Sequence, residues 1–360
     1  MAAAPEKRSG SVFGWIRAKL FPSPLSSVAS IVILYLAWQA IPPFIDWAFL
    51  DAIWRAPDSA ACRAAAGACW VFVTEKYRFI LFGTYPYEEH WRPALAIFLL
   101  ITLWAASLAP MFWRRWLPLM WLAGLAAIGV LMWGGIGGLS YVENERWGGL
   151  VLTLLLTTFG IGGAFPLAVL LALARRSRMP VLQGLAVGFI ELVRGVPLIS
   201  LLFMASVMLP LFLPAGVSID KLLRAQIALI LFAAAYLAEV VRGGLQVVPR
   251  GQYEAADALG LSYWRKTVLV ILPQALKIAI PPLVNSFIGL FKDTSLVLII
   301  GLFDLLSTVK IVLTDPVWSG FGVEAYLFAS LVYFVFCYAM SRYSQRLEWR
   351  LARAEGARPR

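Results

Sequence analysis

The feature that most limits how this chain can fold is a series of apolar blocks, most of them about 20 residues long. A helix of that length crosses a hydrocarbon core of roughly 30 Å. Because no water is present there to bond the backbone, only helices and closed β-barrels can span it. Barrel strands alternate polar and apolar residues about every second position, and these blocks do not. With 61% hydrophobic and only 14% charged residues, the sequence predicts an all-α integral membrane protein.

Eight blocks qualify as expected transmembrane helices. The fifth is longer than one crossing needs. The seventh contains Pro281 and Pro282 near its start. We expect this pair to break or delay the helix there, because proline lacks a backbone N–H and clashes with the preceding turn. The expected spans are 25–45, 93–112, 117–135, 149–174, 183–212, 225–247, 279–301 and 324–343.

The Lys and Arg residues of the loops predict the orientation, because cytoplasmic loops carry an excess of them. If the N-terminal segment is cytoplasmic, the loops on that side hold 20 basic residues and the opposite loops hold nine. We therefore expect both termini in the cytoplasm and the loop 51–92 in the periplasm, around a cell inner membrane. The net charge of +11 then reflects contact with anionic membrane lipid, and it gives no reason to invoke nucleic acid.

The chain has only three cysteines and one histidine, so few of its side chains are suited to catalysis or metal binding. Cys62 and Cys69 fall in the expected periplasmic loop, where disulfides form. The sequence alone does not decide between a disulfide and two free thiols. Cys337 lies within a span, where packing is its expected role. His90 stands alone, so the sequence offers no histidine metal cluster and no Ser-His-Asp arrangement. We expect no catalytic residues and no metal site.

Polar interruptions divide the chain into four segments. Three spans and the long outer loop precede a unit of five spans. The first three spans are rich in Trp and Tyr, which suit the membrane–water boundary, and we expect an accessory role for them. The segments are 1–24 (cytoplasmic), 25–147 (three accessory helices with the loop 51–92), 148–345 (five-helix core with a cytoplasmic loop at 248–278) and 346–360 (basic cytoplasmic tail).

The cytoplasmic loop at 248–278 is predicted to hold a short helix, a turn and a second helix. Pro249 and Gly251 should end the preceding span. The run that starts at Glu254 consists of good helix formers, and its glutamate stands in the first turn, where the helix dipole favours a negative charge. Gly260 stands where a left-handed C-terminal cap would fall. Pro273 prevents the following stretch from being an uninterrupted helix.

This loop resembles the one shared by permease subunits of binding-protein-dependent ABC importers, which reads Glu-Ala-Ala, three residues, Gly, nine residues and Ile-x-Leu-Pro. The resemblance implies a helix that docks into a groove of the ATPase subunit. Small Ala255 and Ala256 would allow close approach, and Glu254 would add polar contacts. Movement of the ATPase would then tilt the attached spans. Valine for isoleucine is a mild departure. The matching residues are Glu254, Ala255, Ala256, Gly260 and Val270-Ile271-Leu272-Pro273.

A finer resemblance, to the polar amino-acid branch of these permeases (the histidine/glutamine/arginine permease family), covers about residues 148–345. It implies a type I ABC-importer core built from the last five helices. The added N-terminal spans are similar to those of the long permeases of general L-amino-acid transport systems of Gram-negative bacteria. The stretches that carry the finer resemblance are FIELVRGVPL at 189–198, AYLAEVVRGGLQ at 235–246 and PPLVNSFIGLFKDTSL at 281–296.

Ionisable residues inside the spans suggest where a solute would bind, because such residues usually face a cavity or a partner. An amino acid needs an acceptor for its ammonium and donors for its carboxylate. Counted from Pro180 at about 1.5 Å per residue, Glu191 lies about 16 Å along the fifth span, with Arg194 one turn further. Glu191 or Asp293 can accept, and Arg194, Lys292 or Asn285 can donate. The candidate solute contacts are Glu191, Arg194, Asn285, Lys292, Asp293 and Thr294.

Structural roles remain open for the same residues. Glu191 and Arg194 could form an ion pair that fixes helix orientation, and Lys292–Asp293 could cap or hinge a helix. The solute site could also lie mainly in a second permease chain. Glu239 and Arg242, three residues apart, are better interpreted as a structural pair near the cytoplasmic end of a span. The hydroxyls of Thr153, Thr157 and Thr158 are weaker candidates, since such groups often bond their own helix.

No Gly-x-x-x-x-Gly-Lys-Ser/Thr phosphate loop occurs in the sequence, so we do not expect this chain to hydrolyse ATP or to bind a cofactor. The resemblance implies that ATP and Mg are used by a partner ABC ATPase dimer. A second permease chain, the same or different, and a periplasmic amino-acid-binding protein would complete the transporter. The sequence thus predicts a permease subunit for ATP-driven import of L-amino acids. The alternative is an ATP-independent secondary transporter or channel, which leaves the cytoplasmic loop unexplained.

Overall fold

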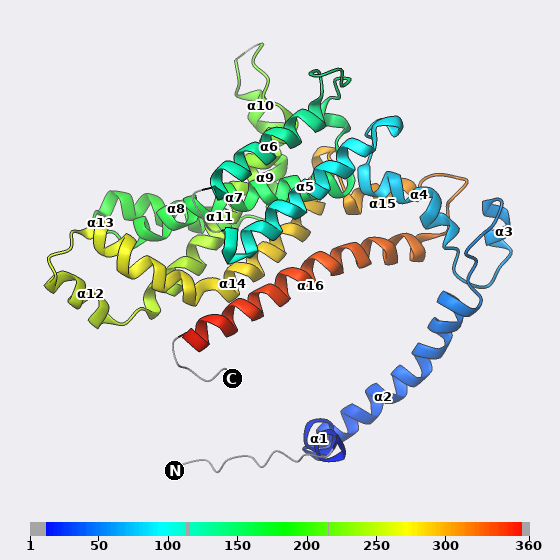
Figure 1. The fold of residues 1–360 in the computed structure, drawn as a ribbon, viewed down its shortest axis with the longest axis horizontal. Helices are drawn as coiled ribbons and strands as arrows, with labels where there is room; N and C mark the ends of the chain where they lie inside the picture. The colour runs from blue at the N-terminus through cyan, green and yellow to red at the C-terminus, as the bar shows by residue number, and fades with distance from the viewer. Residues whose placement is uncertain (1–11, 113–115, 215, 355–360) are drawn as a thin grey trace. The chain divides into compact units, whose positions relative to one another are not determined.

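The computed structural model of the chain describes residues 12–112, 116–214 and 216–354. Helices make up almost all of its regular structure (Figure 1), which confirms the predicted all-α fold class. The chain divides into two compact units, Met1–Thr74 and Glu75–Arg360. The expected cytoplasmic segments at the two ends of the chain lie partly outside the described residues.

The first unit is built around one long apolar helix, α2 (Pro24–Ile45). The helix starts after Ser23, whose hydroxyl oxygen accepts a hydrogen bond from the Ser26 backbone N–H at 3.3 Å, as an N-cap does. It continues into a π-helical turn, Asp46–Leu50. No residue of α2 is buried, so its apolar surface suits contact with lipid. The unit also contains α1 (Val12–Leu20), α3 (Ser59–Arg63) and the start of α4 (Val71–Phe82).

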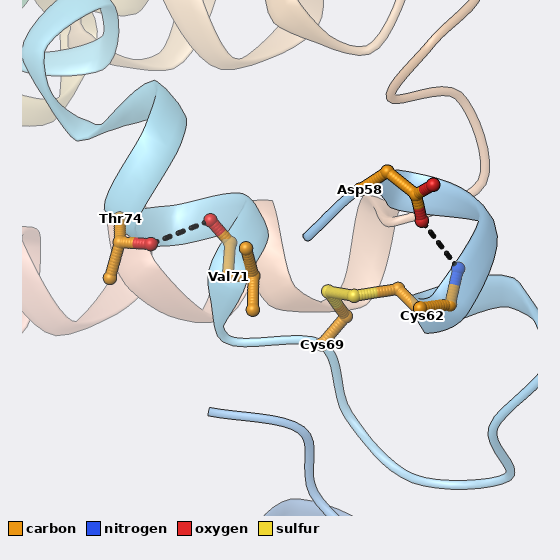
Figure 2. Close-up of a disulfide and its surroundings, with 6 residues drawn as sticks. Asp58, Cys62, Cys69, Val71 and Thr74 are labelled. Carbon is orange, nitrogen blue, oxygen red and sulfur yellow. Dashed lines mark hydrogen bonds between the residues drawn. A yellow bond between two sulfur atoms is a disulfide. The ribbon is translucent and has the colours of Figure 1, made fainter. Parts of the chain in front are cut away.

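Cys62 and Cys69 are joined by a disulfide in the loop that follows α2 (Figure 2), with their Cα atoms 5.6 Å apart. Both residues are buried, with exposed fractions of 2% and 1%. Beside them, the Asp58 carboxylate caps α3 by accepting a hydrogen bond from the Ala61 N–H at 2.9 Å. Of the two states that the sequence left open, the structure takes the disulfide.

The second unit centres on α7 (Gly149–Arg175), α11 (Lys221–Val247) and α14 (Leu272–Asp293). α7 and α11 make the most extensive contact of any two elements. Ala164 and Ala168, one turn apart on α7, are fully buried. Small residues let the backbones of membrane helices approach closely, and this close packing is what holds such helices together in lipid.

The other elements of this unit surround the three central helices. The helices are α5 (Trp91–Leu108), α6 (Leu117–Trp133), α8 (Pro180–Gly195), α9 (Leu198–Phe203), α10 (Leu209–Leu211), α12 (Arg250–Ala258), α13 (Tyr263–Lys266), α15 (Leu305–Val312) and α16 (Gly322–Ala354). The short 3₁₀ and π segments are Tyr87–Glu89, Pro110–Phe112, Asn144–Arg146, Met204–Met208, Thr267–Ile271 and Thr294–Ile300, and the one strand named among the described residues is β1 (Phe303–Asp304).

α11 approaches α14 closely at Gly244. A Cβ atom at this position would lie 2.4 Å from the Ala275 carbonyl oxygen and 3.2 Å from the Ala279 side chain. The preceding residue, Gly243, has open space where its Cβ would be. These adjacent glycines of one helix therefore differ: the lack of a side chain at Gly244 permits the contact with α14, whereas a side chain at Gly243 would not affect it.

The segment before the expected five-span core packs on the start of α7. Gly83 has a φ of +65°, and a Cβ atom there would lie 2.5 Å from the Cα of Gly148. The hydroxyl of Thr308 donates a hydrogen bond to the Ile80 carbonyl at 2.9 Å. These contacts join residues from 75 onward to the core. The predicted boundary at 148, between three accessory helices and a five-helix core, stays a prediction.

An ion pair fastens the same segment to the loop after α15. The Lys76 ammonium lies 2.8 Å from the Asp315 carboxylate. This hydrogen bond lowers the pKa of the Asp315 carboxyl, because it favours the charged form. The ion pair is therefore present at neutral pH and is lost only as the pH falls through the lowered pKa of Asp315.

Among the described residues, six helical segments are long and apolar enough to cross a membrane. A bent pair, α8 with the segment Leu198–Leu211, gives up to seven, and α6 is shorter, with 17 residues. The expected total of eight thus stays a prediction. The six segments are Pro24–Leu50, Tyr87–Leu108, Gly149–Arg175, Lys221–Val247, Tyr263–Ile300 and Gly322–Leu351.

The expected fifth span differs from a single helix, because it bends by 102° between α8 and α9. Val196 has φ −109° and ψ 133°, and Pro197 follows it. A residue before proline is pushed out of the helical region by the proline ring. The bend therefore follows from the Val-Pro dipeptide and explains why the apolar block is longer than one crossing needs.

The expectation that Pro281 and Pro282 break or delay the seventh span is wrong. Both prolines lie inside α14, which runs from Leu272. Membrane helices tolerate interior proline when neighbouring groups satisfy the freed backbone carbonyls. The change in geometry comes at the other end, where α14 passes into the 3₁₀ segment Thr294–Ile300 and stops at Gly301, with a φ of +74°.

The close approach at Gly244 generates a first prediction. Gly244→Ala should lower the free energy of unfolding by about 1–3 kcal/mol, because the new methyl group meets the α14 backbone. Gly243→Ala is the matched control, since it makes the same change in the same helix without a steric conflict. The measurement is the thermal unfolding midpoint of the purified protein in detergent. Equal midpoints for the two variants would contradict the close packing of α11 on α14.

The disulfide is expected to form in cells. Alkylation of the unfolded chain before and after reduction, read by mass spectrometry, should find Cys62 and Cys69 blocked until a reductant is added. In the Cys62→Ser variant, Cys69 should react without reduction, while Cys337 serves as an internal control thiol in every sample. Reaction of both residues without reduction in the unchanged chain would exclude the disulfide.

Candidate functional site

The short helix α12 (Arg250–Ala258) ends in a specific hydrogen-bonded cap. The N–H of Leu261 donates to the Ala256 carbonyl at 3.2 Å, and the N–H of Gly260 donates to the Asp257 carbonyl at 2.9 Å. This pair of bonds is the Schellman pattern, which requires a left-handed residue after the helix. Gly260 has a φ of +68°, so the predicted left-handed cap is confirmed.

α12 begins earlier than predicted. Val248 is extended and Pro249 is the N-cap, so α11 ends before the proline. Gly251 lies inside α12, and its expected role in breaking the preceding helix is wrong. Glu254 lies more than a turn from the start, so its expected place in the first turn is also wrong. The cause is the proline, whose fixed φ suits the residues that open a helix.

Only part of the α12 surface is open to a partner. Glu254 and Ala255 are exposed, whereas Ala256 is buried, with 2% exposed. The hydroxyl of Tyr253 donates to the Leu245 carbonyl at 3.2 Å, which anchors α12 to the end of α11. Close approach of a partner at both alanines is therefore not supported: Ala255 is available, and Ala256 packs against this chain.

Two further contacts connect α12 to the spans. The Arg176 guanidinium, one residue beyond α7, donates to the Leu245 carbonyl at 2.8 Å and to the Tyr253 hydroxyl at 3.2 Å. The Gln274 amide of α14 donates to the Gln252 side chain of α12 at 3.1 Å. Through these contacts, α12 is attached to the ends of α7, α11 and α14, so a displacement of α12 acts on all three.

The helix that follows the turn is not one uninterrupted α-helix, as Pro273 predicted, but its segments follow one another without a loop. α13 passes into the π-helical segment Thr267–Ile271, and α14 then starts at Leu272 with Pro273 in its first turn. The missing N–H of a proline is tolerated in the first turn of a helix. The wider π-turn thus carries the chain from α13 to α14 without a loop. Leu272 is partly buried and Pro273 is exposed.

Five charged side chains from three helices form one cluster around Glu239, named here the Glu239 cluster. The Glu239 carboxylate lies 2.8 Å from Arg242, 3.0 Å from Arg175 and 3.8 Å from Arg194. Arg175 also pairs with Glu191 at 2.9 Å. The predicted Glu239–Arg242 pair is confirmed. Glu191 and Arg194 do not pair with each other in this cluster, because each is held by a residue of another helix.

The remaining candidate solute contacts lie on α14 and just after it. Asn285 and Lys292 are exposed and seven residues apart, so they lie on nearly the same face. Asp293 is half-buried. Thr294 is fully buried, and its hydroxyl donates to the Phe291 carbonyl of its own helix at 2.9 Å. Among the described residues, no ion pair or hydrogen bond joins this set to the Glu239 cluster.

The threonines of α7 behave as helix-bound hydroxyls. Thr157 donates to the Thr153 carbonyl and Thr158 to the Leu154 carbonyl, both at 2.7 Å. Thr153 donates to the Gly149 carbonyl and also accepts a hydrogen bond from a backbone N–H near β1 at 3.1 Å. Their hydroxyls are therefore used within the chain.

The sequence did not reveal two residues that organise this region. Arg175 bridges two carboxylates, although its position among loop arginines indicated only membrane topology. Tyr253 anchors α12, and its place between Gln252 and Glu254 gave no sign of this. A signal did exist for Arg175, since Glu239 and Glu191 both lie in apolar blocks and need cationic partners.

In the described part of the chain, no group of three or more His, Cys, Asp or Glu residues could hold a metal ion.

Comparison with known proteins identifies the family of the chain. The model of the family described as "Binding-protein-dependent transport system inner membrane component" matches residues 164–353. The inner membrane amino-acid ABC transporter permease protein YhdY of Escherichia coli is 53% identical over 342 residues, which cover 93% of this chain and 92% of that protein. The glutamate/glutamine/aspartate/asparagine transport system permease protein BztC of Rhodobacter capsulatus is 40% identical, with 97% of this chain and 96% of that protein covered.

A solved structure described as an amino acid ABC transporter with histidines is also similar. It is 31% identical, with a TM-score of 0.49, and the match covers 56% of this chain and 91% of that one. The family match spans more than half of the chain and includes α12 and the Glu239 cluster, and the two relatives match over nearly its whole length. The chain therefore belongs to the family of inner-membrane components of binding-protein-dependent transport systems.

Proposed function

We propose that this chain is the permease subunit of an ABC transporter that imports L-amino acids from the periplasm to the cytoplasm. The observation that carries the proposal is α12, a short helix with an exposed Glu254–Ala255 surface, closed by the Gly260 cap and attached to three spans. Relatives whose names refer to amino-acid transport match nearly the whole chain, which supports the solute class.

The driving force would come from a separate subunit. The sequence contains no phosphate-binding loop, so ATP and Mg would be used by an ABC ATPase dimer that meets α12. A push on α12 would pass through Tyr253 and Arg176 to α11 and α7, and through Gln252 to α14. A second permease chain and a periplasmic amino-acid-binding protein would complete the transporter.

The orientation belongs to the same proposal. Both termini and α12 would lie in the cytoplasm, and the loop with the disulfide would lie in the periplasm. The excess of Lys and Arg in the loops on the α12 side supports this arrangement. A buried disulfide in the opposite loop also supports it, because disulfides persist in oxidising compartments.

For the solute, the face of α14 that carries Asn285 and Lys292 is the better supported of the two candidate sets. Exposed polar groups on a span are costly against lipid and are found beside cavities or partner helices. Lys292 would bind the solute carboxylate, and Asp293 would bind its ammonium. Glu191 and Arg194 would have a structural role instead, because other residues of the Glu239 cluster already hold them.

The solute assignment predicts a specific transport defect. Lys292→Met should raise the KM for amino-acid uptake about 10- to 100-fold, since a hydrogen bond to a charged group contributes about 1.5–3 kcal/mol. Lys310→Met, which removes an equal charge from an exposed position of α15, is the matched control. Uptake is measured in vesicles that contain the whole transporter, together with retention of the ATPase. A normal KM for Lys292→Met would remove this residue from the solute site.

The coupling assignment predicts a second defect. Gly260→Ala should strain the cap by about 1–2 kcal/mol, because a side chain is disfavoured in the left-handed region. Glu254→Lys leaves the backbone unchanged and reverses the charge of the exposed surface. Both variants should insert normally and lose ATP-dependent uptake. Subunit retention, ATP hydrolysis and uptake are measured on the same lipid-reconstituted complex.

Gly251→Ala is the matched control for the coupling test, because Gly251 lies in α12, has open space around it and does not need a positive φ. This variant should keep all three activities. If Gly260→Ala and Glu254→Lys also keep them, α12 is not the coupling element. Uptake that persists after removal of the ATPase would favour a secondary transporter or channel.

A further inference from the structure

A cleft of about 930 Å³ lies beside α12, and neither proposed role assigns a ligand to it. It is bounded by the last part of α7, the start of α8, and the α12–α13 segment, which occupy the left side of Figure 1. Its volume is near the upper end of the range of about 300–1,000 Å³ that is usual for small-molecule sites. The cleft can therefore hold a ligand of considerable size.

One wall of the cleft is apolar and extends along a span. Leu167, Leu170 and Leu171 line it on one side of α7, at the three- and four-residue spacing that places them together. Leu167 precedes Arg175 by about 12 Å of helix, which is most of the roughly 15 Å half-thickness of a hydrocarbon core. Leu170 is 58% exposed, so this wall can be reached from within the bilayer.

The rim of the cleft is cationic. Arg176, Arg178 and Lys266 stand there against one carboxylate, Asp257, which Lys266 binds at 2.5 Å. Arg178 is exposed, and it forms no ion pair with any carboxylate of the described residues. The rim thus keeps a net positive charge and a guanidinium that can bind a phosphate.

Two aromatic side chains line the cleft close to Lys266 in the sequence. Tyr263 and Trp264 line the cleft and are 54% and 61% exposed. Tyr and Trp side chains favour the headgroup level of a membrane, where one end of the ring is apolar and the other is wet. The order along the cleft is therefore cationic and aromatic at the rim and apolar inside, as in a phospholipid that is anionic at one end.

We propose that this cleft binds an anionic phospholipid of the inner leaflet. The headgroup phosphate would lie between Arg178 and Lys266, and an acyl chain would lie along Leu167, Leu170 and Leu171. The proposal rests on the proposed function in one respect, the cytoplasmic location of α12. A loop of the ATPase is the other conceivable occupant, but it would have to enter the hydrocarbon layer to fill the apolar wall, and irregular backbone does not enter that layer against lipid.

A lipid at this place would connect two segments that lie on different sides of the cleft. It would touch the α7–α8 link through Arg178 and the α13 helix through Lys266 and Trp264. Since Tyr253 and Asp257 of α12 also line the cleft, the lipid would help to keep α12 against the spans. Anionic lipid would therefore support coupling between ATP hydrolysis and uptake.

The test is photolabelling of the intact transporter. The permease with its ATPase is reconstituted into phosphatidylcholine vesicles that contain a trace of either photoactivatable phosphatidylglycerol or photoactivatable phosphatidylcholine. Labelled peptides are mapped by mass spectrometry. Phosphatidylglycerol should label the segments 167–182 and 253–271 more strongly than phosphatidylcholine. The expected difference is about fivefold for each rim cation that binds the headgroup.

Arg178→Gln should cut the phosphatidylglycerol labelling of these segments about fivefold and leave phosphatidylcholine labelling unchanged. The matched control is Arg265→Gln, which removes the same charge from an exposed position of α13 that does not line the cleft. Equal labelling by the two lipids, or equal loss in the two variants, would overturn the proposal. So would cross-linking of a photoreactive amino acid at position 170 to the ATPase instead of lipid.

The outcome can be separated from that of the proposed function. Labelling needs neither solute nor ATP hydrolysis, so absence of selective labelling leaves the coupling role of α12 standing. Conversely, normal coupling in Gly260→Ala and Glu254→Lys would remove that role while the lipid could still label the cleft.

Discussion

Close contact between helix backbones is the interaction on which the rest of this structure depends. In lipid, burial of one apolar helix against another gains little over contact with acyl chains, so association relies on packing at short range. The buried alanines of α7 and the Gly244–Ala275 approach provide such packing among the three central helices. The positions of the Glu239 cluster and of α12 follow from it, because α7 and α11 carry three of the five cluster residues and α12 is attached to α11, α14 and the residue after α7.

Ion pairs between the packed helices further fix their arrangement. The Glu239 cluster combines three arginines and two glutamates from α7, α8 and α11, so each carboxylate is paired with an arginine of another helix. Breaking a partly buried pair leaves an unpaired charge, which is strongly unfavourable. The cluster therefore favours one arrangement of these three helices over others, and a change of arrangement must exchange these partners together.

Sequence predicted the features that depend on local chemistry. The apolar blocks, the short helix before Gly260 and the left-handed cap itself follow from residue types and spacing. Features that depend on neighbours did not follow: Pro281 and Pro282 remain within α14, because surrounding helices can compensate for lost backbone bonds. In the candidate site, the Glu239–Arg242 pair lay within one helix and was predictable, whereas the links of Glu191 and Arg194 to other helices required the fold.

The attachment of residues 75–83 to the start of α7 has a mechanical consequence. Gly83 lies against Gly148, and Thr308 ties Ile80 to α15, at the end of α7 opposite to α12. α7 has 27 residues, or about 40 Å of helix. A rod that is pinned at one end and pushed at the other pivots, so displacement grows along its length. If the ATPase pushes α12 as proposed, residues 75–83 would hold the opposite end of α7, and the displacement of α7 would be largest near the Glu239 cluster.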